Sequence, residues 1–219
     1  MDILELMASR HSVRQYSDRE IEPAKKEILE RFIGEINAES GMRICIRYNE
    51  EQIFNSFLAH YGKFENVKNY VALIGKKGLE ESSGYYGEQV VLKAQELGLN
   101  TCWVALTYKK SAVKPLLQKG EKLYCVLALG YGKTQGHSRK SKRLEEVSKL
   151  FGDKPDYWDK GVQACLLAPT ATNQQKFEIV CRDGQVEVKK KGVGFYTQTD
   201  LGIVKCHFEL ATGVKVFYR

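Results

Sequence analysis

The sequence lacks the long apolar run and the nucleotide-binding glycine motifs that define several large protein classes. No stretch approaches the roughly 20 apolar residues of a membrane span. The start, Met1-Asp2-Ile3-Leu4-Glu5, has neither the basic segment nor the apolar middle of a signal peptide. No Gly-x-Gly-x-x-Gly follows a strand and no Walker loop is present, which argues against a dedicated dinucleotide domain. We therefore expect a cytoplasmic protein with no membrane partner.

Paired cysteines and clustered histidines are also missing. The six cysteines occur singly, mostly within apolar runs, and none forms a Cys-x-x-Cys pair: Cys45, Cys102, Cys125, Cys165, Cys181 and Cys206. We expect small buried hydrophobic residues in a reducing compartment rather than disulfides or zinc ligands. The four histidines are scattered, and His207 is expected to pack on its own helix. No metal site and no catalytic acid or base is predicted.

Charge and composition favour a folded protein that handles anions. The chain has 219 residues, of which 43% are hydrophobic, enough for one sizeable core. Its net charge is +7, yet basic residues are mostly interleaved with acids, and only 139–143 and 189–191 are one-signed. No zinc-finger spacing or RNA-binding signature accompanies them, so nucleic acid is not the expected partner. A basic protein that binds small anionic molecules fits at least as well.

Apolar periodicity predicts both helices and strands along the chain. Helices are expected over 2–9, 23–37, 50–60, 85–97 and 111–118, from Leu144, from Pro155 to before Pro169, and from a Thr199 cap to Ala211. Strands are expected over 42–48, 70–74, 101–106, 123–129, 177–181, 185–189 and 214–218. Arg182-Asp183-Gly184 is a hairpin signal. The mixture indicates an α+β fold rather than a doubly wound parallel sheet.

One short segment carries a candidate anion site. Arg10, Ser12 and Arg14 project to one side of an extended segment, and in a helix the two arginines still share a face. Two guanidinium groups and a hydroxyl suit a compact polyanion such as phosphate, which Arg binds bidentately. Two nearby arginines are also common as solvated charge in a basic protein, so this spacing alone leaves both interpretations open.

The segment from Arg10 to Tyr16, Arg-His-Ser-Val-Arg-Gln-Tyr, resembles the N-terminal signature of the FMN-dependent nitroreductase family. In that family the segment holds the phosphate, ribityl chain and ring edge of the flavin. The resemblance implies FMN as the cofactor. It also implies FMN-binding roles for Arg10, His11, Ser12 and Arg14.

Two later segments resemble the same family. Residues 86–103 end in Leu-Gly-Leu-Asn-Thr-Cys-Trp, and in the family the residues after this Trp run along the flavin ring. This implies ring contacts from Trp103, Val104, Ala105 and Leu106, although a core strand without a ligand is the alternative. Residues 130–147 resemble the family's Gly-Tyr pair, basic stretch and Leu-Glu-Glu. There Lys140 and Lys142 are implied phosphate contacts, while Arg143 stands where many members have Pro.

A further family motif is out of place. Residues 167–177 resemble the Ala-Pro-Ser-x-x-Asn-x-Gln-Pro-Trp loop, which ordinary members carry early and use to cover the flavin of the partner subunit. Residues 35–41, at the ordinary position, do not match. The resemblance thus implies flavin-ring contacts from Pro169, Thr170 and Asn173 of the same chain.

Faint internal repetition fits this displacement, because residues 88–97 and 201–210 align at a constant offset. We expect a nitroreductase-like mixed or antiparallel central sheet flanked by helices, with an internal pseudo-repeat. Residues 1–150 would form an FMN-binding half, and 151–219 a shortened second half that completes the flavin site in one compact unit. A monomer would suffice, and further dimerisation is not excluded.

The resemblance implies an FMN-dependent NAD(P)H oxidoreductase of nitroreductase type. NAD(P)H would reduce the flavin and leave, and a nitroaromatic, quinone or similar acceptor would then take the electrons in a ping-pong cycle. Two alternatives stay open. A flavin-degrading oxygenase of destructase type would consume the flavin during turnover. A non-catalytic anion or RNA binder built on the basic clusters would purify colourless and bind polynucleotides with steep salt dependence.

Overall fold

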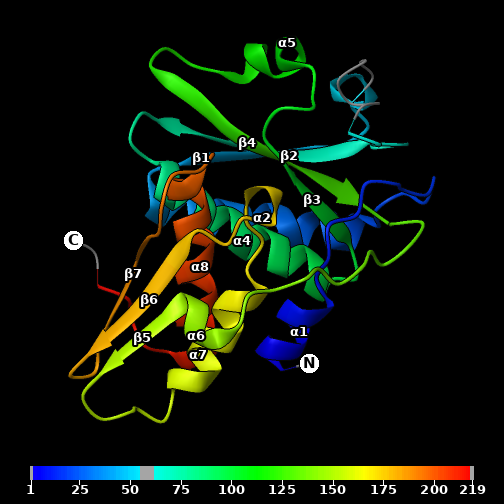
Figure 1. Ribbon diagram of the computed structural model, residues 1–219. Helices are drawn as coiled ribbons and strands as arrows, with labels where there is room; N and C mark the ends of the chain where they lie inside the picture. Colours follow the sequence, from blue (N-terminus) through cyan, green and yellow to red (C-terminus); the bar gives the residue numbers. More distant parts are fainter. Residues whose placement is uncertain (1, 55–61, 218–219) are drawn as a thin grey trace. The chain divides into compact units, whose positions relative to one another are not determined.

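The computed structural model describes residues 2–54 and 62–217, and the chain divides into two compact units. The first, here called the four-stranded unit, comprises Arg10–Leu79 and Gln89–Ser138. The second, the three-stranded unit, comprises Met1–Ser9, Glu80–Glu88 and Arg139–Arg219. Each takes its name from its sheet (Figure 1).

The four-stranded unit is built on an antiparallel sheet of order β1-β2-β4-β3. Its strands are β1 (Arg43–Arg47), β2 (Asn69–Lys76), β3 (Asn100–Val104) and β4 (Glu121–Gly130). The helical elements among its described residues are α2 (Pro23–Ser40), η1 (Glu51–Ile53), α5 (Lys110–Val113), η2 (Lys114–Leu116) and the second half of α4 (Glu80–Glu96). The Asn37 side chain of α2 accepts from the Ile44 amide at 2.7 Å and donates to its carbonyl at 2.9 Å, which fixes α2 to β1.

The core of this unit explains why the strands read as continuous apolar runs. Residues 70–75 of β2 and 124–130 of β4 are buried on both faces of the sheet. One apolar cluster joins alternate strand residues, including Ala72, Cys102 and Val126, to Val13 and Tyr16 of the arginine segment. Alternation places these strand residues on one face. The arginine segment is therefore anchored by the core of this unit.

The three-stranded unit has a mixed sheet of order β5-β6-β7. Here β5 (Ser148–Phe151) runs parallel to β6 (Phe177–Arg182), which pairs antiparallel with β7 (Gln185–Lys190). Asp183 and Gly184 between β6 and β7 both have positive φ, as a two-residue hairpin turn of type I′ requires. The helical elements of this unit are α1 (Ile3–Ser9), α6 (Leu144–Val147), α7 (Trp158–Leu167), η3 (Ala171–Asn173) and α8 (Thr197–Thr212).

Helix α4 (Glu80–Glu96) contributes residues to both units. Its first half packs on α8 inside the three-stranded unit. A Cβ atom on Gly84 would overlap the Thr199 carbonyl, and one on Gly202 would overlap the Glu81 carbonyl. Glycine at both positions lets the two helix backbones approach closely. Fully buried Glu88 of α4 and His207 of α8 pair at 2.9 Å, and the His207 Nδ1 lies 2.9 Å from the Ala164 carbonyl oxygen.

The α+β class, most of the expected helices and strands, and the 177–189 hairpin are confirmed. The six cysteines are free, as expected. Several boundaries were wrong. Helix α4 begins at Glu80 rather than 85, β3 ends at Val104 rather than 106, α7 begins at Trp158, and 111–118 holds only short helical turns. Strand β5 was not predicted.

Three further expectations need correction. Thr199 lies inside α8, which starts at Thr197, so it is not the cap. Of the expected terminal strand, the described residues 214–217 make only the bridge between Phe217 and Glu187. His207 packs on α4 and α7 rather than only on its own helix. The expected helix over 50–60 coincides with η1 at its start, and residues 55–61 lie outside the described residues.

Candidate functional site

The arginine segment runs as an extended strand-like stretch beside β3. Ser12 forms a parallel bridge with Thr101, and the Val13 amide donates to the Thr101 carbonyl at 3.0 Å. Further along, the Tyr16 amide donates to the Glu65 carbonyl at 3.1 Å. Val13 is buried, whereas Ser12 and Arg14 on either side of it are exposed. The extended alternation thus presents Ser12 and Arg14 away from the core of the unit.

Cys102 on β3 shows how closely the segment approaches this strand. Burial raises the pKa of the Cys102 thiol. Three groups act in the opposite direction: the charge of Arg14, a hydrogen bond with Ser12, and the charge of Arg10. Arg10, Ser12 and Arg14 thus all act on one β3 side chain, although Arg10 is buried whereas Ser12 and Arg14 are exposed.

A cleft of about 370 Å³ opens beside Arg14 in the four-stranded unit. It is lined by Arg14, Gly62, Lys63, Phe64, Trp103, Val104, Ala105 and Thr107. Two of the matched segments, the arginine signature and the stretch after β3, therefore meet in one concave site. Leu106 is exposed and is not part of the lining. The cleft combines two cationic side chains with two aromatic ones.

Lys63 and Phe64 were missed by sequence reasoning. They lie far from both matched segments along the chain and belong to no recognisable motif. Lys63 adopts a left-handed backbone (φ 58°), which is uncommon for a residue that is not glycine. That conformation is visible only in the folded chain.

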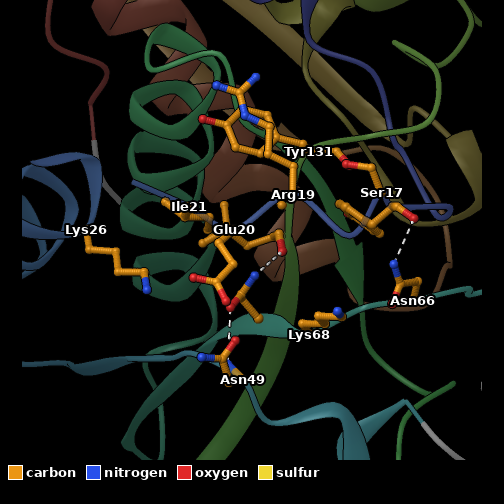
Figure 2. Close-up of a pocket in the computed structure, with 13 residues that line it drawn as sticks. Ser17, Arg19, Glu20, Ile21, Lys26, Asn49, Asn66, Lys68 and Tyr131 are labelled. Atoms are coloured by element: carbon orange, nitrogen blue, oxygen red, sulfur yellow. Dashed lines mark hydrogen bonds between the residues drawn. The ribbon is translucent and has the colours of Figure 1, made fainter. Parts of the chain in front are cut away.

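A second polar pocket of this unit is shown in Figure 2. It lies between residues 16–21, Lys26, Asn49, 66–69 and 129–131, and Figure 2 labels Arg19, Glu20 and Tyr131 at its wall. Its volume is about 10 Å³. That is room for about one water molecule, so the pocket is too small to be the ligand site of this unit.

The other implied cofactor residues come together in the three-stranded unit. The Asn173 Nδ2 donates to the Lys140 carbonyl at 2.7 Å, and the Lys142 Nζ donates to the Gln175 carbonyl at 2.7 Å. The Lys142 amide also donates to the Gln175 Oε1 at 2.8 Å. Pro169 is buried, and the Thr170 Oγ1 accepts from the Gln175 amide at 3.0 Å. The basic loop and the displaced loop are thus directly joined.

The displaced loop holds an unusual backbone. Thr172, Asn173 and Gln175 have φ values of 51°, 56° and 43°, in the left-handed region that residues other than glycine rarely adopt. For the β-branched Thr172 this conformation is particularly unfavourable. Strain of this kind persists where the surrounding structure enforces it, and it clusters at ligand-binding sites.

Asp200 of α8 is one of the groups that enforce this loop. Its Oδ1 accepts from the Ala171 amide at 2.9 Å, and its Oδ2 accepts from the Gln174 Nε2 at 2.7 Å. Burial raises the pKa of Asp200 to about 6, and the two hydrogen bonds only partly offset it. The loop is therefore tied to a carboxyl group that titrates in the mildly acidic range.

Several solved structures share this fold. A "putative nitroreductase" from Thermotoga maritima MSB8 matches with a TM-score of 0.67 and 24% identity, over 96% of this chain and 83% of that chain. A nitroreductase family protein from Streptococcus pneumoniae TIGR4 matches with a TM-score of 0.54 and 12% identity, over 67% of this chain and 98% of that chain. A "Putative NADH dehydrogenase/NAD(P)H nitroreductase" from Bacteroides thetaiotaomicron VPI-5482 matches with a TM-score of 0.52 and 15% identity, over 66% of this chain and 95% of that chain.

The family model described as "Putative TM nitroreductase" matches residues 2–212 of this chain. The chain therefore belongs to that nitroreductase family. No curated protein matches it. Among the described residues, no helix combines the length and apolar character needed to cross a membrane.

Proposed function

We propose that this chain is an FMN-binding oxidoreductase that uses NAD(P)H to reduce a nitroaromatic, a quinone or a similar small acceptor. The observation that carries the proposal is the cleft in which Arg14 meets Trp103, Val104 and Ala105. These residues come from two segments that separately resemble flavin-contacting parts of the family. The Bacteroides relative is named as an NAD(P)H nitroreductase, which supports NAD(P)H as the electron donor.

The residues of the cleft fit this cofactor. Its volume, about 370 Å³, lies in the usual range of ligand sites, about 300–1,000 Å³. Arg14 and Lys63 suit a phosphate or the carbonyl edge of a flavin ring, and Trp103 and Phe64 offer apolar surface to the ring. When bound, FMN supplies hydride acceptance and electron donation, and the protein supplies binding, orientation and exclusion of water.

The Asn173 side chain offers an acceptor for an N–H group of the flavin ring. Its Oδ1 is buried and has no hydrogen-bond partner within the part of the chain that the structure describes. The bond from its Nδ2 to the Lys140 carbonyl fixes which amide atom is the unsatisfied acceptor. The proposal assigns Asn173 to the flavin ring on this ground and on the sequence resemblance. The proposed flavin contacts of the other implied residues rest on the resemblance alone. These residues are Arg10, His11, Ser12, Leu106, Lys140, Lys142, Pro169 and Thr170.

We also propose that the chain is an internal pseudo-repeat, with halves 1–150 and 151–219. The crossing of α4 and α8 supports it. A Cβ on Gly84 would meet the Thr199 carbonyl and the Ile203 amide, and a Cβ on Gly202 would meet the Glu81 carbonyl and the Tyr85 amide. Exchanging 84 with 202, 81 with 199 and 85 with 203 converts one contact set into the other. This correspondence between positions of the two helices differs from the sequence alignment of the two halves, which pairs Glu88 with Leu201.

The test is a redox cycle in the absence of oxygen. Protein loaded with FMN should lose its flavin absorbance when NADH or NADPH is added and regain it when a quinone or nitroaromatic follows. Recovery of all the flavin absorbance supports a reductase. Irreversible loss after admission of O₂ would instead indicate a flavin-degrading oxygenase, and failure to bind FMN would refute the proposal.

A further inference from the structure

The segment between β7 and α8 carries the most exposed apolar side chains described in this chain. Val193 is 85% exposed and Phe195 is 81% exposed, and the neighbouring Tyr196 is exposed as well. Single exposed apolar residues are ordinary on protein surfaces, but three within four positions form a patch. We call residues 192–196 the apolar tip.

The backbone of the apolar tip is held in place although its side chains project outward. The Gln174 Nε2 donates to the Phe195 carbonyl at 2.7 Å, and the Lys176 Nζ donates to the Val193 carbonyl. A Cβ atom on Gly194 would overlap the Gln174 Oε1, so glycine permits this close approach. The polar backbone groups therefore face the protein, and the apolar side chains face outward.

A cluster of lysines flanks the tip. Lys189, Lys190 and Lys191 precede it directly and are exposed. The carboxylate of Glu178 lies 3.0 Å from the Lys149 Nζ, 3.8 Å from the Lys189 Nζ and 3.7 Å from the Lys191 Nζ. One carboxylate thus faces three ammonium groups, and this surface keeps a net positive charge.

We propose that the apolar tip and its lysines bind the surface of an anionic phospholipid bilayer. Aromatic side chains favour the headgroup level of a membrane, and lysines next to them are attracted to anionic lipids. An apolar segment beside a basic one combines the two signals that stable peripheral binding needs. The inference does not depend on the proposed cofactor, and it revises the expectation from the sequence that the chain has no membrane partner.

The chemistry of the tip favours lipid over the two other anionic partners. Val193 is the most exposed large apolar residue described, and an aliphatic side chain gains little by stacking on a nucleic-acid base. An acidic protein would pair its carboxylates with the flanking lysines, but the tip itself would offer it only apolar side chains. The carbonyls of Val193 and Phe195 are already bonded to the chain's own side chains.

The experiment measures sedimentation of the full chain with lipid vesicles. At low salt the protein should sediment with vesicles of phosphatidylcholine and phosphatidylglycerol, but not with phosphatidylcholine alone. High salt should release it, because salt screens exposed charges. The double variant Val193→Ser/Phe195→Ser should lose at least about tenfold in vesicle affinity. The control Leu210→Ser removes an exposed apolar side chain from α8 and should bind as the wild type does.

A second readout keeps the test independent of the double variant's stability. In Phe195→Trp, the new indole fluorescence, measured against the native Trp103 and Trp158, should shift to the blue when anionic vesicles are added. Absence of sedimentation with anionic vesicles, or an unchanged affinity of the double variant, would overturn the proposal. So would binding of poly(U) that depends on Val193 and Phe195 while vesicles do not bind.

Discussion

Gly84 and Gly202 occupy equivalent positions at the crossing of α4 and α8, and each makes room for a backbone carbonyl of the other helix. The carbonyls of Thr199 and Glu81 are rigid parts of helices, so they cannot move aside as a flexible side chain would. The two glycines therefore set how closely the helices approach. The same crossing brings Glu81 to the Lys205 Nζ at 2.5 Å and Tyr85 to Glu209 at 2.8 Å.

Replacing Gly202 with Ala should destabilise the fold. The new methyl group would overlap the Glu81 carbonyl, so the helices must separate and lose contacts along the whole crossing. We expect a loss of about 3 kcal/mol or more in the free energy of unfolding, measured by urea titration. Gly34→Ala is the matched control, because Gly34 is a helical glycine with nothing within 4 Å. The free energy of unfolding of that variant should rise by roughly 0.5–1 kcal/mol. Equal effects of the two substitutions would contradict the packing described.

Asp200 should make stability depend on pH between about 4 and 6. Its pKa in the folded protein is raised to about 6 from an ordinary 3.8, so the folded state binds the proton more tightly than the unfolded state does. The free energy of unfolding contributed by this group therefore falls as pH rises through this window, by roughly 2–3 kcal/mol.

The test compares the wild type with Asp200→Asn, which cannot titrate at this position. Urea unfolding at pH 4 and pH 7 should show that the wild type loses more stability over this range than the variant does. Other titrating groups are common to both proteins and cancel in the comparison. A wild type that loses less stability than the variant would show that folding does not raise the pKa of Asp200.

The sequence predicted the buried strands well, because β2 and β4 are continuous apolar runs that are buried on both faces. Strand β4 ends at Gly130, whereas β2 runs through Gly75 to Lys76. It missed the first turn of α4, because Glu80 to Ser83 are polar. They are helical because α8 packs on them, and Lys205 pairs with Glu81 from far along the chain. The predicted cap at Thr199 failed for a related reason, since burial against Gly84 places Thr199 inside α8.

The candidate site was predictable only in part. Arg14 and Trp103 belong to segments with a recognisable pattern, and the structure brings both to one cleft. Lys63 and Phe64 carry no pattern and join the cleft only through the tertiary fold. The left-handed backbone of Thr172 was likewise hidden, because a β-branched residue does not signal it.

Lys140 and Lys142 should distinguish FMN from riboflavin. The resemblance assigns both lysines to the flavin phosphate, which riboflavin lacks. Replacing both with Ala should weaken FMN about tenfold or more while leaving riboflavin affinity nearly unchanged. Flavin fluorescence titrations with the two ligands measure this directly. Equal weakening of both would show that these lysines act on loop 168–175, where the Lys142 Nζ already bonds the Gln175 carbonyl, rather than on a phosphate.

One chain should bind one FMN without a partner subunit. The chain carries the arginine signature once, together with the displaced loop that ordinary family members contribute from a second subunit. Flavin content per chain, measured alongside the mass of the species in light scattering, should stay near one when the protein is diluted to monomer. Loss of FMN upon dilution would contradict the predicted single-chain site.

The most direct test of the proposed cofactor site is the FMN dissociation constant of Arg14→Ala. Arg14 is exposed and lines the cleft, so the substitution should leave the melting temperature nearly unchanged. Losing one charge-assisted contact should weaken FMN by roughly 1.5–3 kcal/mol, about tenfold or more. Arg31→Ala, which removes the same charge from an exposed position on α2, should bind FMN as the wild type does. Equal FMN affinity in wild type, Arg14→Ala and Arg31→Ala would contradict the assignment of this cleft to the flavin.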